Sequence, residues 1–349
     1  MGKQLRFIAA MILLLIISCD EPETVVTNYV HPDGSVTRKI EMRNIENDFK
    51  TSGLQIPFDS TWTISDSLEI SEKGDTTWVK RAEKTFSSVE ELNSAYLTDS
   101  GANRNVPRNI TLTKKFKWFN TEFRFSENIP ETLEFGYPVS DFLNREELVY
   151  FYSPENLKNE QTSGPDSLKF RMMSDSINYK SDKWAAMSII STWIGQMGKL
   201  TEGKGGEKMI SGLKSDESRI ARLLEEKYGE KFDSLWENGI ILKELVGEDN
   251  AVRYRAEADS AIKIAMESFF IDFKEYSVRT VMPGKLTATN GYIDSSNILL
   301  WPVKSDFFLT QKYEMWAESK VPNKWAWIVS GVFVMFVLTG VTLRAIKRG

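Results

Sequence analysis

The sequence predicts an α+β protein in which a helical insertion packs on one face of an antiparallel sheet, followed by one C-terminal transmembrane helix. Short segments within residues 24–180 and 277–303 alternate apolar and polar side chains, as half-buried strands do. Residues 181–276 instead carry apolar side chains three to four positions apart, which is typical of amphipathic helices. The 19 residues from Trp325 to Leu343 are uncharged and long enough to cross a bilayer.

The start of the chain has the pattern of a signal peptide. Lys3 and Arg6 precede an apolar stretch of 11 residues, and Cys19 follows the small residue Ser18. This resembles the lipobox of bacterial lipoproteins, which implies cleavage before Cys19 and attachment of a diacylglyceryl group, with acyl chains such as palmitate, to its thiol. The alternative is an uncleaved signal anchor in which Cys19 is a passive thiol.

Basic residues around the C-terminal apolar run predict its orientation. Lys324 stands before it, and Arg344, Lys347 and Arg348 follow it. The positive-inside rule therefore places the short tail in the cytoplasm and the ectodomain in the periplasm or outside the cell. Together with the lipid on Cys19, this predicts two anchors in the cell membrane, so the bilayer is the first expected partner. If both anchors enter one membrane, the first and last strands of the sheet face the same bilayer.

The composition limits the chemistry that the ectodomain can perform. Without the six basic residues of the two anchor segments, 38 basic residues stand against 49 acidic ones, a net charge of about −11. We therefore expect no nucleic-acid partner and a poor match to anionic lipid headgroups. One cysteine and one histidine, His31, are too few for a disulfide or a multi-histidine metal site. The expectation is a protein that is not an enzyme and has no cofactor or metal.

Two β-hairpins are predicted near the start of the ectodomain. Residues 25–29 and 36–42 alternate on either side of a type I turn at 31–34, and residues 62–71 and 76–86 flank a second turn. A short helix, capped by Ser87 or Ser88, is expected to follow.

The next strand candidate, Ile110 to Phe125, is the most aromatic segment of the chain. A β-bulge near Trp118 and Phe119 would place five aromatic rings on one face of one strand. The simpler interpretation is the core of a sheet, and the more specific one is an aromatic wall lining a ligand pocket. The candidate pocket residues are Phe116, Trp118, Phe119, Phe123 and Phe125.

The rest of the ectodomain is predicted from the same patterns. We expect one helix at 141–151, a strand at 168–172 and a long helix at about 249–276. Strands then close the sheet between 277 and 303, with corners at Pro-Gly and at Asn-Gly, the dipeptide best suited to positive φ. Residues 306–319 are less regular and lead to the membrane. The predicted division is a signal peptide 1–18, a lipidated cysteine and spacer 19–23, a β-rich part 24–180, a helical insertion 181–276, closing strands and a juxtamembrane segment 277–323, and a membrane helix with its tail 324–349.

Several turn motifs of the ectodomain carry a resemblance to a known family. An Asp-Gly-Ser turn follows the lipobox, and a Pro-Gly corner, an Asn-Gly corner and a strand containing tryptophan precede a single C-terminal span. This combination resembles LppM-type lipoproteins, membrane-anchored bacterial proteins with a small mixed α/β ectodomain. The residues that carry it are Asp33, Gly34, Pro283, Gly284, Asn290, Gly291 and Trp301. The resemblance implies a non-enzymatic ectodomain that binds lipid or another envelope component.

These observations predict a doubly anchored lipoprotein that acts as a binding or assembly module of the bacterial cell envelope. One alternative is a structural subunit of a membrane complex, with Gly331 and Gly340 of the span packing against partner helices. The other is a hydrolase that uses paired carboxylates.

Overall fold

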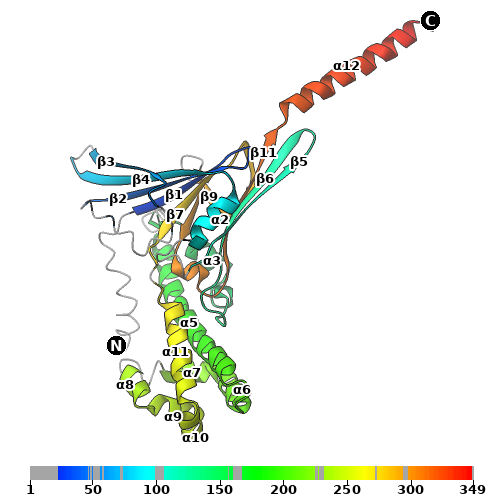
Figure 1. Cartoon of the computed structure of the whole chain (residues 1–349). Helices are drawn as coiled ribbons and strands as arrows, with labels where there is room; N and C mark the ends of the chain where they lie inside the picture. Colours follow the sequence, from blue (N-terminus) through cyan, green and yellow to red (C-terminus); the bar gives the residue numbers. More distant parts are fainter. Residues whose placement is uncertain are drawn as a thin grey trace.

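The computed structural model describes residues 23–347, with gaps at 46, 48, 50–55, 57–58, 71–73, 99–105, 156, 160–166, 225–226, 228–231, 272 and 294–297. The predicted α+β class is confirmed: the chain forms a seven-stranded sheet, a four-stranded sheet, a helical region and a separate C-terminal helix (Figure 1). The predicted lipidation site, Cys19, lies outside the described residues.

The seven-stranded sheet has the order β3-β4-β2-β1-β7-β10-β9. Its strands are β1 (Glu23–Val30), β2 (Val36–Asn44), β3 (Thr63–Ile70), β4 (Thr76–Phe86), β7 (Tyr276–Val281), β9 (Tyr292–Ile293) and β10 (Leu299–Val303). Both predicted hairpins, β1–β2 and β3–β4, are present, and strands from the end of the ectodomain complete the sheet as expected. The sheet is mixed and not purely antiparallel, because β1 and β7 run parallel. A parallel pair requires a crossover connection, here the long chain between these two strands.

The four-stranded sheet has the order β5-β6-β11-β8 and is antiparallel. It contains β5 (Asn109–Phe116), β6 (Asn120–Ile129), β8 (Lys285–Thr289) and β11 (Tyr313–Pro322). The strand β11 falls in the region expected to be irregular. Its inward positions include Ala317 and Ser319, so the apolar alternation that identifies a strand is weak there.

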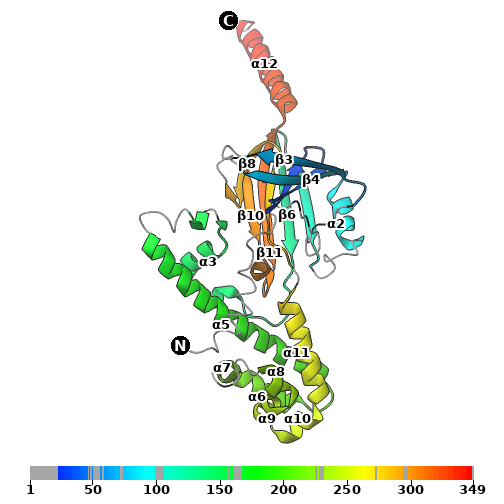
Figure 2. The ribbon, with the colours of Figure 1, turned by 90° about the vertical axis from the view of Figure 1, so that its left-hand side faces the viewer.

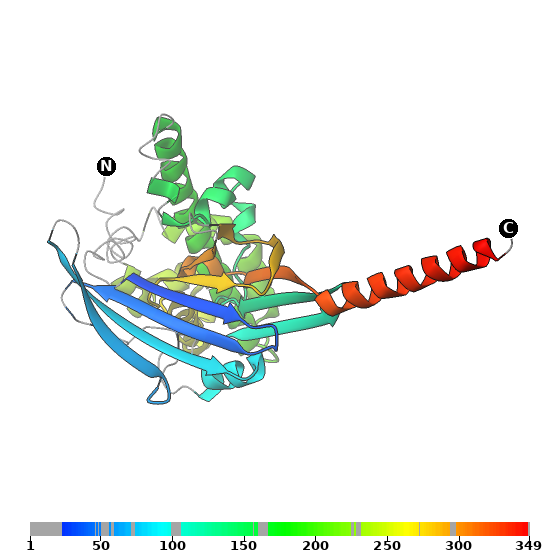
Figure 3. The ribbon, with the colours of Figure 1, turned by 90° about the horizontal axis from the view of Figure 1, so that it is seen from above.

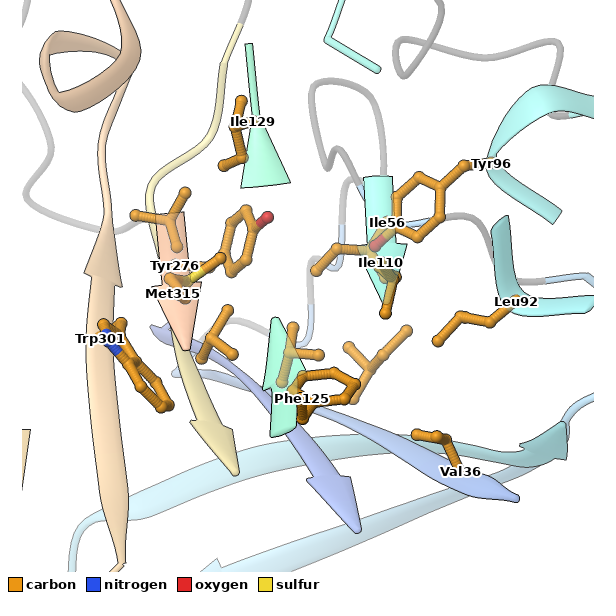
Figure 4. Packing of buried hydrophobic residues seen from close by; sticks show 14 of the residues in the cluster. Val36, Ile56, Leu92, Tyr96, Ile110, Phe125, Ile129, Tyr276, Trp301 and Met315 are labelled. Carbon is orange, nitrogen blue, oxygen red and sulfur yellow. The ribbon is translucent and has the colours of Figure 1, made fainter. Parts of the chain in front are cut away.

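The inner faces of the two sheets enclose the main core. Phe125 and Ile129 of β6 lie opposite Tyr276 of β7 and Trp301 of β10 (Figure 4). The predicted short helix is α2 (Val89–Thr98), which contributes Leu92 and Tyr96 to the same core. At its start the backbone N–H of Glu91 donates to Ser88 Oγ at 3.3 Å, and the Glu91 carboxylate accepts from the N–H of Ser87 at 2.7 Å.

The helical region extends away from the sheets and does not lie flat on one face of them (Figures 1 and 2). Its elements are η2 (Val139–Asp141), α3 (Arg145–Phe151), α5 (Ser167–Leu200), α6 (Glu207–Ser215), α7 (Glu217–Leu223), α8 (Phe232–Glu237), α9 (Ile240–Val246), α10 (Glu248–Arg253) and α11 (Arg255–Phe269). The helices α6 to α11 pack with the second half of α5 around a core of their own, including Trp193, Ile194 and Ala261. We call this unit the helical arm.

Three predicted elements in this region are wrong. Residues 168–172 begin α5 and form no strand; Leu168 and Met172 are one helical turn apart and exposed, while Phe170 stacks on Tyr150. The helical insertion therefore begins before residue 181. The helix expected at 141–151 is divided into η2 and α3, because Asn144 caps a new helix. The long helix expected at 249–276 breaks at Tyr254 and ends at Phe269.

The last strand leads directly into α12 (Lys324–Ile346), which lies at the opposite end of the molecule from the helical arm (Figure 1). The turn between β1 and β2 lies near the α12 end, because Lys114 Nζ donates to the carbonyl of Pro32 at 2.7 Å. Since β1 has eight residues, its first residue, Glu23, is about 26 Å from that turn. The end of β1 near α12 is therefore its last residue, Val30. Two anchors that emerge together would instead require the first residue of β1, which leads to Cys19, to lie near α12.

Candidate functional site

The aromatic segment 110–125 folds as a hairpin and not as one bulged strand. Lys117 and Asn120 exchange backbone hydrogen bonds of 2.8 and 3.2 Å, so Trp118 and Phe119 form a tight turn between β5 and β6. The hairpin projects toward the start of α12 (Figure 3). The prediction failed because this turn contains two bulky aromatic residues and no glycine or proline, the usual signals of a short hairpin loop.

The turn separates the five candidate pocket aromatics into two groups. Phe123 and Phe125 are both 2% exposed and belong to the interior of the protein. Phe116, Trp118 and Phe119 are 61%, 47% and 40% exposed at the end of the hairpin. The five rings therefore do not share a face, and they do not form the wall of one pocket.

The three exposed rings lie against the first residues of α12. Phe116 stacks on Trp325 with ring centroids 6.3 Å apart and planes 7° apart. Trp118 meets Trp325 edge-on at 5.2 Å, and Phe119 contacts Trp327 at 4.4 Å. We call these five residues, Phe116, Trp118, Phe119, Trp325 and Trp327, the aromatic junction. Three of the five are tryptophans, whose apolar ring with a polar N–H is enriched where protein crosses from membrane to water.

A polar side chain fixes the same junction. Asn323, between β11 and α12, donates its backbone N–H to the carbonyl of Phe119 at 2.9 Å. Its Nδ2 donates to the carbonyl of Lys117 at 2.7 Å, and its Oδ1 accepts from Thr121 Oγ1 at 3.0 Å.

Two indole N–H groups add hydrogen bonds at the same place. Trp327 Nε1 donates to the carbonyl of Phe119 at 3.2 Å, and Trp118 Nε1 donates to Ser330 Oγ at 2.8 Å. The start of α12 is thus held to the four-stranded sheet by side-chain and backbone bonds, with no free linker between them.

The turn motifs singled out from the sequence lie at two places. Asp33 and Gly34 form the β1–β2 turn, where Gly34 has φ 107° and Asp33 Oδ1 accepts from the backbone N–H of Ser35 at 2.9 Å. The bonds from Ser35 lower the pKa of the Asp33 carboxyl. Pro283 and Gly284 instead carry the chain from the seven-stranded sheet to the four-stranded one, between β7 and β8.

Asn290, Gly291 and Trp301 meet where the chain returns to the larger sheet. Asn290 Oδ1 accepts from Trp301 Nε1 at 3.0 Å and from the backbone N–H of Trp316 at 2.9 Å. A Cβ on Gly291 would lie 2.5 Å from Trp301 Cε2, so glycine is required by the closeness of the indole. The prediction of positive φ at this dipeptide is wrong, since neither residue is among the positive-φ positions of the described chain. These motif residues join the two sheets.

A buried cluster of charged residues, missed from the sequence, also links the sheets. Arg38 of β2 donates to Asn28 Oδ1 at 2.8 Å, to the Tyr96 hydroxyl and to Glu127 Oε2 at 2.6 Å. Arg108 Nε lies 3.8 Å from Glu127 Oε1. The signal was present in the sequence, because the alternation of β2 places Arg38 on the same inward face as Val36 and Ile40.

Burial and neighbouring charges have opposite effects on the pKa of Arg38 in this cluster. Burial disfavours the charged guanidinium of Arg38, but the neighbouring Glu127 and Tyr96 outweigh it and raise the pKa of Arg38. Burial raises the pKa of Tyr96 and of Tyr276, which keeps both phenols neutral. Two guanidinium groups therefore share the single carboxyl group of Glu127 inside the protein.

Comparisons with known proteins add little to this geometry. No protein-family pattern matches the chain, and no curated protein matches it. Among solved structures, the chain is similar to the NMR structure of the folded domain of Mycobacterium tuberculosis LppM, with 9% identity over 87% of this chain and 91% of that one. The TM-score is 0.27, which is too low for the likeness to carry an argument. In the described part of the chain, no group of three or more His, Cys, Asp or Glu residues is placed to hold a metal ion.

Proposed function

We propose that this protein is a membrane-anchored extracytoplasmic module that binds or assembles with another component of the bacterial cell envelope, without enzymatic activity. The observation that supports it best is the arrangement along the molecule: the apolar helix α12 at one end and the helical arm at the other (Figure 1). At 1.5 Å per residue, the 23 residues of α12 make a helix of about 35 Å, long enough to span a bilayer. The basic residues on either side of α12 support a position of the sheets and the arm outside the cytoplasm.

The proposed lipid on Cys19 supplies a second anchor, with a geometric consequence. Glu23 is four positions after Cys19, so the two residues are at most about 14 Å apart. Glu23 lies at the end of β1 that points away from α12. Both anchors therefore enter one bilayer only if the seven-stranded sheet leans toward the membrane.

The helical arm is the part of the molecule best placed to meet a partner. It carries exposed apolar residues, including Ile240 on α9 and Val252 on α10, which are 46% and 72% exposed. Its own core keeps it folded while its surface stays available. The aromatic junction, by contrast, is occupied by contacts with α12.

A photo-crosslinking amino acid at Val252 or Ile240 is expected to trap one component of constant mass in intact membranes, because these side chains face outward on the arm. Matched probes at Thr113 and Thr287, exposed on the four-stranded sheet, are expected to trap far less of it. Equal labelling from the arm and from the sheet, or no adduct from the arm, would contradict the proposal.

The alternative of a structural subunit that packs through α12 gains one relevant observation. A Cβ at Gly331 or Gly340 would meet nothing within 4 Å, so both positions are open to neighbouring helices. Nine residues correspond to two and a half helical turns, at about 100° per residue, so the two glycines face opposite sides of α12. They cannot form a single packing face, which favours the binding module over this alternative.

A further inference from the structure

We propose that the end of the four-stranded sheet next to α12 is a binding surface for anionic lipid headgroups. This proposal rests on the proposed membrane anchoring by α12 and adds the class of lipid that the anchored ectodomain recognises. It concerns the sheet face beside the aromatic junction, which we call the lysine rim. The rim consists of Lys115, Lys117, Lys285 and Lys320, together with Glu122.

The strand register places most of these residues in one row. Lys115 of β5 lies opposite Glu122 of β6, Glu122 lies opposite Lys320 of β11, and Lys320 lies opposite Lys285 of β8. Paired residues of neighbouring strands point to the same face, so one row crosses all four strands. With strands about 4.8 Å apart, the row is roughly 14 Å long.

The row contains more positive charge than the protein itself neutralises. Glu122 binds Lys117 at 2.8 Å and Lys320 at 3.0 Å, and both lysines lower the pKa of its carboxyl. Lys320 and Lys285 then face one another directly, and like charges in this position destabilise a sheet. An external anion placed between their ammonium groups relieves that repulsion, as a lipid phosphate does.

The height of the rim matches the position of headgroups on a membrane crossed by α12. Trp118 reaches Ser330, six residues and about 9 Å beyond the start of α12. The aromatic junction therefore lies at the boundary between headgroups and hydrocarbon. Lys320 is three residues before Asn323, or about 10 Å further out along β11, which is within a Debye length of the surface charge. Long lysine side chains cover part of that distance.

The distribution of charge therefore changes the expectation taken from bulk composition. The body as a whole is acidic, but four lysines of the rim stand against one glutamate, a local charge of about +3. The attraction of a protein to anionic lipid depends more on basic residues close to the membrane than on the net charge of a distant domain.

The test uses the full chain and native mass spectrometry of protein released from vesicles of equal phosphatidylglycerol and phosphatidylcholine. We expect preferential retention of phosphatidylglycerol, and a decrease of that preference by about fivefold for each lysine removed in Lys115→Gln and Lys285→Gln. These positions leave the two ion pairs of Glu122 in place. The matched control, Lys208→Gln with Lys214→Gln on the helical arm, is expected to keep the preference of the unsubstituted protein.

Two results overturn the proposal: equal retention of the two lipids by the unsubstituted protein, or an unchanged preference in the Lys115→Gln, Lys285→Gln variant with an unchanged melting temperature. Alkaline carbonate extraction of the same membranes separates the two proposals. Protein released by carbonate contradicts membrane anchoring, whereas protein retained without lipid preference contradicts only the lysine rim.

Discussion

Replacing Glu127 by glutamine is expected to lower the free energy of unfolding by about 3–5 kcal/mol. Glu127 is the carboxyl group that Arg38 contacts at 2.6 Å and that Arg108 approaches at 3.8 Å, and all three side chains are buried. Without it, two guanidinium groups remain inside the protein without a counter-charge, and water cannot reach them. Urea unfolding of the full chain in detergent, followed by tryptophan fluorescence, measures the change.

A matched control lies on the same strand. Glu122→Gln makes the same chemical change in β6, but its ion pairs with Lys117 and Lys320 lie on the solvent face. Such pairs contribute little to stability, so this variant is expected to unfold close to the unsubstituted protein. Equal effects of the two substitutions would show that the buried cluster does not hold the sheets together.

The second large effect is expected from Gly284→Ala, at roughly 2–6 kcal/mol. Gly284 has φ 75°, which disfavours any side chain, and an added Cβ would collide with the carbonyl oxygen of Lys320 in β11. A backbone oxygen within a sheet cannot move aside as a flexible side chain does. The expected result is a lower melting temperature and a weakened pairing between β8 and β11, measured by calorimetry and by amide hydrogen exchange.

Gly34→Ala separates the two causes of that effect. Gly34 also has positive φ, at 107°, but an added Cβ there meets nothing within 4 Å. Only the backbone cost remains, about 1–3 kcal/mol. If Gly34→Ala proved as damaging as Gly284→Ala, the close approach of β7–β8 to β11 would not explain the requirement for glycine.

Some local elements of this protein follow from short stretches of its sequence. The hairpins β1–β2 and β3–β4 are apparent because apolar alternation and turn residues lie within about twenty residues of each other. The division into two sheets is not apparent, because it depends on which distant strand pairs with β8 and β11. Alternation shows that a strand has an inward face, but it does not show which strand lies beside it.

The candidate site shows the same limit. The aromatic residues stand out in the sequence, but their positions depend on a reversal at Trp118 and Phe119 that carries no usual turn signal. Their contact with Trp325 joins segments more than two hundred residues apart. For Arg38 the alternation of β2 does predict an inward side chain. The sequence does not show its partner, because Glu127 lies on the other sheet.

We infer that α12 and the sheets form one rigid unit, held together by the bonds from Asn323 and Trp327 to the β5–β6 turn. Electron-electron double resonance in nanodiscs measures the distance between spin labels at Thr113→Cys on β5 and Ile346→Cys at the end of α12. The unsubstituted protein is the control for labelling at Cys19. One narrow distance distribution is predicted, and Asn323→Ala combined with Trp327→Ala is expected to broaden it, because both side chains bond to the β5–β6 turn. A broad distribution in the protein with Asn323 and Trp327 intact would show instead that α12 moves independently of the sheets.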